Sequence, residues 1–176
     1  YWFVGATATE KTATARLSEL NAAGWDISYD SLDTVGYPSR FDTTVTNLRA
    51  ASDNGRVVWA IPLFQALSLS YQPNKVILAL ADSQQITLNG TPLDVISDGL
   101  RASVTVAPST KLNPTDVTIE TGPLGVTVAG DPFVSMTKGI AAMRLAGPAP
   151  HQYDTYLDLD GFEVPLALRT LFDPDG

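Results

Sequence analysis

From residue 25 onward, apolar and polar side chains alternate one by one along short segments of the chain. Trp25, Ile27 and Tyr29 alternate with acidic or hydroxyl residues, and a second alternating run begins at Phe41, after the sequence Gly36-Tyr37-Pro38. A period of two places successive side chains on opposite faces of a strand, whereas a helix repeats every three or four residues. The pattern therefore predicts two amphipathic strands joined by a corner.

Similar apolar runs continue along the rest of the chain at intervals of about 8–12 residues, a spacing typical of all-β domains. The runs are 57–61, 67–71, 76–80, 86–88, 93–96, 100–106, 117–119, 124–128, 133–136, 140–145, 153–159 and 162–168. Turn residues separate them: Asn89-Gly90, Asp98-Gly99, Gly122-Pro123, Gly130-Asp131. The sequence therefore predicts a mainly β (α+β) fold, either a curved antiparallel sheet or an open sandwich or barrel.

Three of these runs carry a more specific expectation. Pro62 and Pro73 are expected to end the strands that precede them, because proline cannot donate a hydrogen bond to a sheet. The run 76–80 is apolar without interruption, so we expect it to be buried on both faces.

Residues 5–23 are the one helix candidate. Ala6, Ala13, Leu17 and Leu20 form a narrow apolar stripe, and Gly24 is a natural stop signal. We expect residues 1–24 to form a helix next to a membrane and residues 25–176 to form one antiparallel β body.

The chain begins with three consecutive aromatic residues, Tyr1-Trp2-Phe3. Aromatic side chains gather where membrane-spanning helices leave the lipid, so these three suggest the outer end of a missing N-terminal anchor. The alternative is that they pack on the core of the domain. We expect the natural protein to extend beyond both ends of this sequence.

The composition excludes several classes of function. The net charge is -8 and the basic residues are scattered singly, which argues against nucleic acid as a partner. The chain has no cysteine, which excludes disulfides and thiol catalysis. It also has no apolar segment of about 20 residues, the length that a membrane-spanning helix needs.

Catalytic and metal-binding patterns are weak. His151 is the only histidine, lies in a Pro-rich loop and has no nucleophile motif to serve. Asp154, Asp158, Asp160 and Glu163 resemble part of a calcium loop, but apolar residues alternate with them, as in a strand with one solvated face. We therefore expect no enzyme, no catalytic residue, no metal and no cofactor.

Apolar side chains are the remaining candidates for a binding site. The candidates are Trp59, Phe64, Tyr71, Phe133, Met136 and Met143, which lie on predicted strands or at their ends. If the sheet curls without closing, they can line an apolar groove for a lipid or an apolar small molecule. The alternative is that they form an ordinary sandwich core.

The corner after Gly36 has a physical interpretation of its own. Gly36 can adopt a backbone conformation closed to other residues, and Pro38 fixes its own torsion. After the corner, Arg40 and Asp42 should lie on one face and Phe41 on the other. Arg40 can then pair with Asp33 or Asp42, or meet an anionic headgroup.

Several stretches together resemble a known bacterial family. They are Tyr1-Trp2-Phe3, Gly24-Trp25-Asp26-Ile27-Ser28-Tyr29, Gly36-Tyr37-Pro38-Ser39-Arg40-Phe41-Asp42, Trp59-Ala60-Ile61-Pro62 and 70–77. The family is the envelope family called domain of unknown function 2125, and the resemblance is clearest over the first 110 residues or so. A more distant similarity, at the level of fold, is to AsmA-like proteins, which are thought to bridge membranes with a lipid-lined β-groove.

The resemblance implies a cellular location but no catalysed reaction. Members have an N-terminal membrane-spanning segment and a periplasmic β-rich body, so it implies a periplasmic location with an inner-membrane anchor. The family has no established activity, so no catalytic residue is carried over. We expect a non-catalytic protein that binds an apolar or lipid ligand, or an envelope protein partner, through a curved sheet. The alternative is a structural or assembly protein with a filled core and no ligand.

Overall fold

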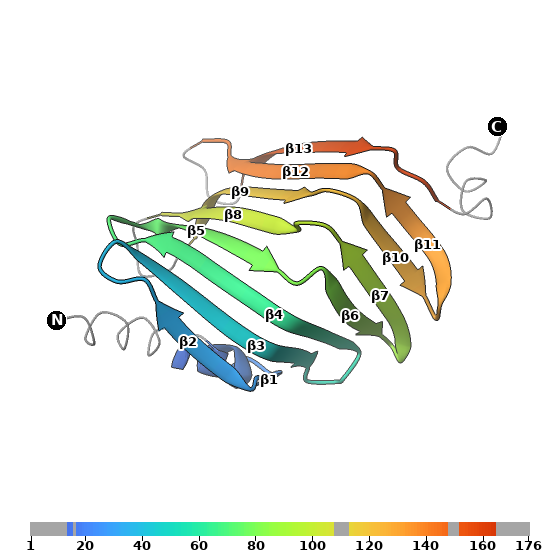
Figure 1. Ribbon diagram of the computed structural model, residues 1–176, viewed down its shortest axis with the longest axis horizontal. Coiled ribbons are helices and arrows are strands. Elements are labelled where there is room, and N and C mark those ends of the chain that lie inside the picture. The colour runs from blue at the N-terminus through green and yellow to red at the C-terminus, as the bar shows by residue number, and fades with distance from the viewer. Residues whose placement is uncertain (1–13, 16, 108–112, 148–151, 165–176) are drawn as a thin grey trace.

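The computed structural model describes residues 14–15, 17–107, 113–147 and 152–164. In this part of the chain, one short helix with residues 14–15 and 17–22 precedes thirteen strands of a single open antiparallel sheet (Figure 1). The strands are β1 (Trp25–Ser28), β2 (Ser31–Val35), β3 (Arg40–Ser52), β4 (Val57–Leu69), β5 (Gln72–Leu80), β6 (Ser83–Leu88), β7 (Thr91–Ser97), β8 (Arg101–Val106), β9 (Pro114–Thr121), β10 (Leu124–Val128), β11 (Asp131–Met136), β12 (Lys138–Leu145) and β13 (Tyr153–Asp160). The predicted mainly β fold with an open antiparallel sheet is confirmed.

The thirteen strands form eight long rows, because ten of the strands lie end to end in pairs. β1 and β2 both pair with β3, and β5 and β6 both pair with the opposite edge of β4. β7 and β8 follow β6 and β5, and β9 and β10 follow β8 and β7. β11 and β12 pair with β10 and β9, and β13 closes the series against β12. Each row is thus an antiparallel neighbour of the next.

The breaks between end-to-end strands line up across the sheet, and we call this line the seam. It consists of 29–30, 47, 62, 81–82, 98–100, 122–123, 137 and 161–162. Backbone hydrogen bonds link its successive rows, from Ala81 N to Leu63 O (2.9 Å), from Gly122 N to Asp98 O (2.9 Å) and from Thr137 N to Asp160 O (2.9 Å). The rows change direction at the seam, where β7 and β10 run at a steep angle to β8 and β9 (Figure 1). The seam is therefore a bend in one continuous sheet.

The alternation of side chains shifts by one residue at the seam. In β4, Ile61 is buried, Pro62 and Leu63 are both exposed, and Phe64 is half-buried. A Cβ atom placed on Gly139 of β12 would lie 2.9 Å from Met136 Sδ of β11 and 3.4 Å from Leu159 Cδ2. Met136 therefore shares a face with residues across the seam, which strict alternation from Gly139 would not allow. Each shift keeps the apolar side chains of both halves on one face of the sheet.

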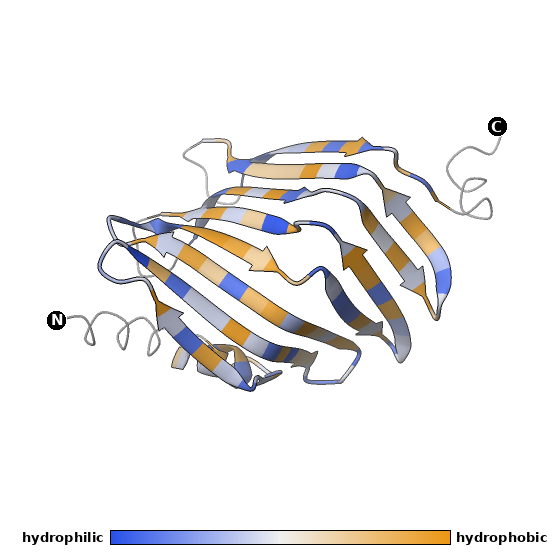
Figure 2. Cartoon of the chain, in the orientation of Figure 1, coloured by the Kyte–Doolittle hydropathy of each residue, from blue (hydrophilic) through white to orange (hydrophobic). Residues whose placement is uncertain are grey.

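The sheet is a single layer with a very small buried core. The buried hydrophobic side chains in the described part of the chain are Val45, Ala51 and Ile61. Apolar and polar residues alternate along nearly every row (Figure 2), as in a sheet that packs on one face at most. The expectation that residues 76–80 are buried on both faces was wrong, because the described residues form no second layer over the sheet there and Ile77 is 41% exposed.

Of the two proline expectations, the one for Pro62 was wrong, whereas β4 does end shortly before Pro73, at Leu69. Pro62 lies inside β4, opposite Asn47 at the seam, where the ladder of paired residues skips one position and needs no donor. Pro73 lies inside β5, at a bulge where the register with β4 shifts. Both prolines lie where the pairing of neighbouring strands is already interrupted, so their missing N–H group breaks no further backbone hydrogen bond.

Turn signals are confirmed as local features, although not all of them reverse the chain. Gly36 has φ of 96°, the Tyr37–Pro38 bond is cis, and the predicted corner connects β2 to β3. Asn89-Gly90 connects β6 to β7 with φ of 50° and 84°, as expected for a tight hairpin. Gly122-Pro123, by contrast, is a bend in one row at the seam.

The N-terminal helix ends as the sequence predicts, with a turn at Ala23 and Gly24 at φ of 96°. No helix of the described residues is long and apolar enough to cross a membrane. The aromatic residues 1–3, the first part of the helix candidate, His151 and residues 165–168 lie outside the described residues.

Candidate ligand-binding face

Four of the six candidate residues share one face of the sheet. Trp59 and Phe64 lie on β4 on opposite sides of the seam, and both are half-buried. Met136 of β11 and Met143 of β12 are half-buried on the same face. The two sulfur-containing side chains and the two aromatic ones are therefore spread over the sheet and do not form a compact cluster.

The other two candidates lie elsewhere. Tyr71 is in the turn between β4 and β5 and is 72% exposed. Phe133 is the extra residue where the register of β10 and β11 shifts, and it is also exposed. Neither residue is paired across the sheet, so the register does not place either of them on the face that the first four share.

The structure adds many residues to that shared face, which we call the apolar face. Pairing register and the shift at the seam place on it, among others, Leu32, Phe41, Val45, Leu48, Ile61, Leu78, Leu80, Ile86, Leu93, Val95, Val104, Val117, Ile119, Leu124, Val126, Ala141, Leu157 and Leu159. Among the described strands, the one charged residue that the register places on this face is Asp131, which lies opposite Val128 at the hairpin end of β11. At about 3.3 Å per residue and 4.8 Å per row, it extends roughly 40 Å in each direction.

The apolar face is open to solvent in the described structure. Most of its side chains are half-buried by their neighbours on the same sheet, and Ile119 is 42% exposed. Soluble proteins seldom expose a continuous apolar patch larger than a few hundred Å², and such patches mark binding surfaces. The size of this face therefore makes it the first candidate for a binding site.

Polar groups on the apolar face lie both at the seam and away from it. Away from the seam, Thr34 and Thr43 face each other on β2 and β3, with their Oγ1 atoms hydrogen-bonded at 2.9 Å. Gln84 is only 5% exposed; its Oε1 accepts a hydrogen bond from Trp59 Nε1 at 3.0 Å, and its Nε2 donates to Ala81 O at 3.3 Å. The hydroxyls of Ser97 and Thr121 are buried without a hydrogen-bond partner in the described structure. The polar groups of the face are thus a minority among its apolar side chains.

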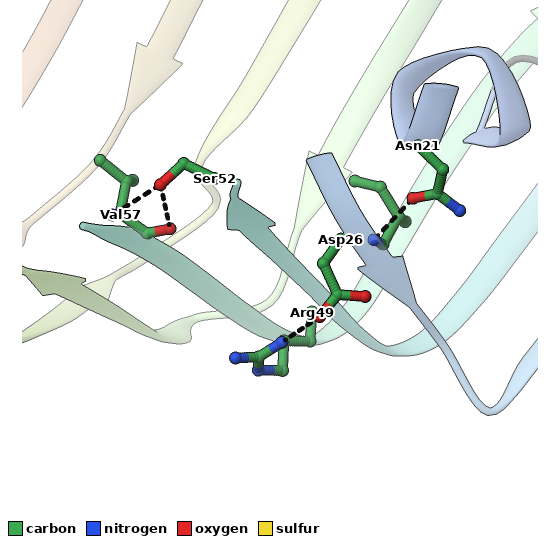
Figure 3. A network of polar contacts seen from close by, with 6 residues as sticks. Asn21, Asp26, Arg49, Ser52 and Val57 are labelled. Atoms are coloured by element: carbon green, nitrogen blue, oxygen red, sulfur yellow. Dashed lines mark hydrogen bonds and ion pairs between the residues drawn. The ribbon is translucent and has the colours of Figure 1, made fainter. Parts of the chain in front are cut away.

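The opposite face, which we call the polar face, carries the charges. Its ion pairs bridge neighbouring rows, as between Arg101 Nη2 and Glu120 Oε2 (2.7 Å) and between Arg49 Nη1 and Asp26 Oδ2 (3.2 Å; Figure 3). Such exposed pairs contribute only about 0–1 kcal/mol each to stability. They show which face of the sheet is built for water.

The pair between Arg40 and Asp42 confirms one sequence prediction. Arg40 Nε lies 2.8 Å from Asp42 Oδ2, so Asp42 and not Asp33 is the partner. Phe41, between them, points to the apolar face, and its ring lies 6.1 Å from that of Tyr37 in the corner. The corner therefore orients the start of β3 as the alternation predicts.

Asp154, Asp158 and Asp160 lie on the polar face of β13, where Leu157 and Leu159 alternate with the last two. The Tyr156 hydroxyl donates a hydrogen bond to Asp158 Oδ2 at 3.2 Å. This hydrogen bond and the negative charge of Asp158 raise the pKa of the phenol. No group of three or more potential metal ligands forms among the described residues.

Sequence reasoning missed most of the apolar face, because it assumed uninterrupted alternation. A signal was present at residues 61–64, where Ile-Pro-Leu-Phe puts two candidate core residues three positions apart. Read together with Asn47 on the neighbouring row, this spacing indicates a change of phase within one strand and not the end of a strand.

The chain was compared with known proteins and families. The model of the bacterial family described as "Uncharacterized protein conserved in bacteria (DUF2125)" matches residues 2–176. No curated protein and no solved structure matches the chain. The family match spans nearly the whole sequence, and the chain therefore belongs to the DUF2125 family of bacterial proteins.

Proposed function

We propose that this protein is a non-catalytic cell-envelope protein whose apolar face binds the hydrocarbon chains of a lipid. The observation that carries the proposal is the continuous apolar face, which is open to solvent in the described structure and has Asp131, at the hairpin end of β11, as its one charged residue among the described strands. Each buried CH₂ group of a ligand gains about 0.8 kcal/mol. An acyl chain laid on this face would therefore gain several kcal/mol without a single polar contact.

The chemistry of the face favours a hydrocarbon over a protein surface as its occupant. Its backbone N–H and C=O groups are engaged in the ladders with neighbouring rows, so only side chains are presented. Typical protein interfaces contain about one hydrogen bond per 100–200 Å², and this face has few groups to make them. A lipid chain requires none.

The envelope location is part of the proposal. It is supported by the resemblance of the first 110 residues or so to membrane-anchored periplasmic proteins. Three aromatic residues at the start of the sequence suit a position close to a membrane surface. A protein placed there would meet lipids as its most abundant apolar ligands.

Native mass spectrometry of the protein mixed with a phospholipid tests the proposal. The informative variant is Ile119→Asn, which puts an amide on the apolar face between Ala102 and Ala141. Its control is Thr118→Asn, the same new side chain one residue away on the polar face. We expect the lipid adduct to be lost in the first variant and kept in the second. Equal adducts in both variants would place the lipid elsewhere, and no adduct in the unmodified protein would refute lipid binding.

A further inference from the structure

A second candidate site lies on the polar face, at the edge of the molecule where β3, β4 and β5 meet. It is a hollow of about 380 Å³, within the size range of small-molecule pockets. Three aliphatic side chains, Leu67, Leu69 and Ile77, line it and form an apolar cluster on the polar face. Arg40, Asp42 and Lys75 line it as well.

The register of the sheet explains why a hollow forms there. Arg40 and Asp42 of β3 lie opposite Leu69 and Leu67 of β4, and Leu67 lies opposite Ile77 of β5. Between Ser68 and Leu69 the pairing with β4 jumps from Val76 to Gln72, so residues 73–75 have no partner on β4. Lys75 remains paired with Thr105 of β8, and because it lies two residues before Ile77, alternation places both side chains on the same face, with Lys75 at the border of the aliphatic cluster.

The two cationic side chains of the hollow, Arg40 and Lys75, have hydrogen-bond donors that no described residue uses. Arg40 uses Nε for its ion pair with Asp42, so its two terminal nitrogens have no partner in the described structure. Arg40 also packs closely over Gly36, because a Cβ at that position would lie 2.7 Å from Arg40 Cγ. Lys75 makes no ion pair with any described residue. The lining therefore has two positive charges against the single negative charge of Asp42, in a chain of net charge -8.

We propose that this hollow binds a small anionic amphiphile, with a phosphate or carboxylate held by Arg40 and Lys75 and a short alkyl chain on Leu67, Leu69 and Ile77. The terminal nitrogens of an arginine suit two oxygens of such an anion, and a lysine adds a point charge. The site is separate from the apolar face, because it lies on the opposite side of the sheet and requires a charged ligand.

Octyl phosphate is titrated into the full chain at low salt, and its binding is monitored by methyl NMR. We expect shifts at the methyl groups of Leu67, Leu69 and Ile77, weakened by added salt. Lys75→Met should weaken binding about ten-fold, because it removes one charge-assisted contact. Arg40→Gln should weaken binding to a similar extent. If Arg40→Gln misfolds, Lys75→Met alone decides the test. Lys138→Met, an exposed lysine of the same face on β12, should bind like the unmodified protein.

Two comparison ligands test whether both halves of the amphiphile matter. Inorganic phosphate and octanol should each bind at least ten-fold more weakly than octyl phosphate. Equal binding of inorganic phosphate would reduce the hollow to an ion site, and equal binding of octanol would make the cations irrelevant; either result overturns the proposal. Unchanged affinity in Lys75→Met overturns it as well, whether or not lipid binds the apolar face.

Discussion

Gly139 illustrates how tightly the apolar face is packed at the seam. A side chain at this position of β12 would lie 2.9 Å from Met136 Sδ, 3.3 Å from Thr121 Cγ2 and 3.4 Å from Leu159 Cδ2. Its φ is not in the left-handed region, so the requirement for glycine is one of space. The absence of a side chain at Gly139 allows three neighbouring rows to fit around Met136.

We predict that Gly139→Val lowers the free energy of unfolding by about 1–3 kcal/mol, the usual cost of overpacking. The matched control is Gly125→Val in β10, where a new side chain would meet nothing within 4 Å. The control should stay within about 0.5 kcal/mol of the unmodified protein, as surface substitutions do. Urea denaturation measures both, and equal losses in the two variants would contradict the account of the seam.

Tyr156 provides a prediction about pH. Its hydrogen bond to Asp158 and the charge of that carboxylate raise the pKa of the phenol above 10.0. The stabilising contribution is therefore present below pH 10 and is lost as the pH rises through the higher folded value. Asp158→Asn should lower the pKa of Tyr156, and Asp160→Asn should lower it less, because Asp160 contributes the weakest of the four causes. An NMR titration of the tyrosine ring measures these shifts, and no change in Asp158→Asn would show that the negative charge of Asp158 does not act on the phenol.

At the scale of elements, the seam depends on residues that tolerate unusual backbone conformations. Asn47 sits in β3 with φ of 49°, a left-handed conformation, and its Nδ2 donates a hydrogen bond to Asp30 Oδ2 at 2.6 Å. Pro62 lies opposite, without a donor to lose. Together they let two long strands bend at the same level without breaking their pairing.

We predict that Asn47→Gly is more stable than Asn47→Ala by about 1 kcal/mol, because alanine is disfavoured in the left-handed region. Both variants lose the hydrogen bond to Asp30, so their difference reports the backbone conformation alone. At the neighbouring Thr46, where φ is not positive, the order should reverse and alanine should be the better replacement. Thermal denaturation of the four variants gives both comparisons, and the same order at the two positions would argue against a backbone origin.

The sequence predicts the elements better than it predicts their connections. The corner at Gly36, the hairpin at Asn89-Gly90 and the placement of Arg40 and Asp42 on one face all follow from local chemistry, and the structure confirms them. Gly122-Pro123 looks like the same kind of signal, yet it bends a row instead of reversing it. The difference depends on the neighbouring row, where Asp98 accepts a hydrogen bond from Gly122, and such a distant contact leaves no local trace in the sequence.

At the scale of the whole molecule, a single-layer sheet with three buried hydrophobic side chains in its described part has little core of its own. Globular domains gain most of their stability by burying apolar surface between layers. Here much of that surface is collected on one face and left half-exposed, which is the arrangement expected of a protein that completes its apolar contacts with a ligand. A bound lipid should therefore also raise the thermal midpoint of unfolding.

The most direct test of the apolar face uses a fatty acid with a spin label on its chain and methyl NMR of the protein. We expect strong broadening of the methyl signals of Val104, Val117 and Ile119 on the apolar face. The methyl signals of Ile77 and Ile96, which are exposed on the polar face, should remain sharp. Equal broadening of both sets, or broadening of Ile77 and Ile96 alone, would contradict the claim that lipid binds the apolar face.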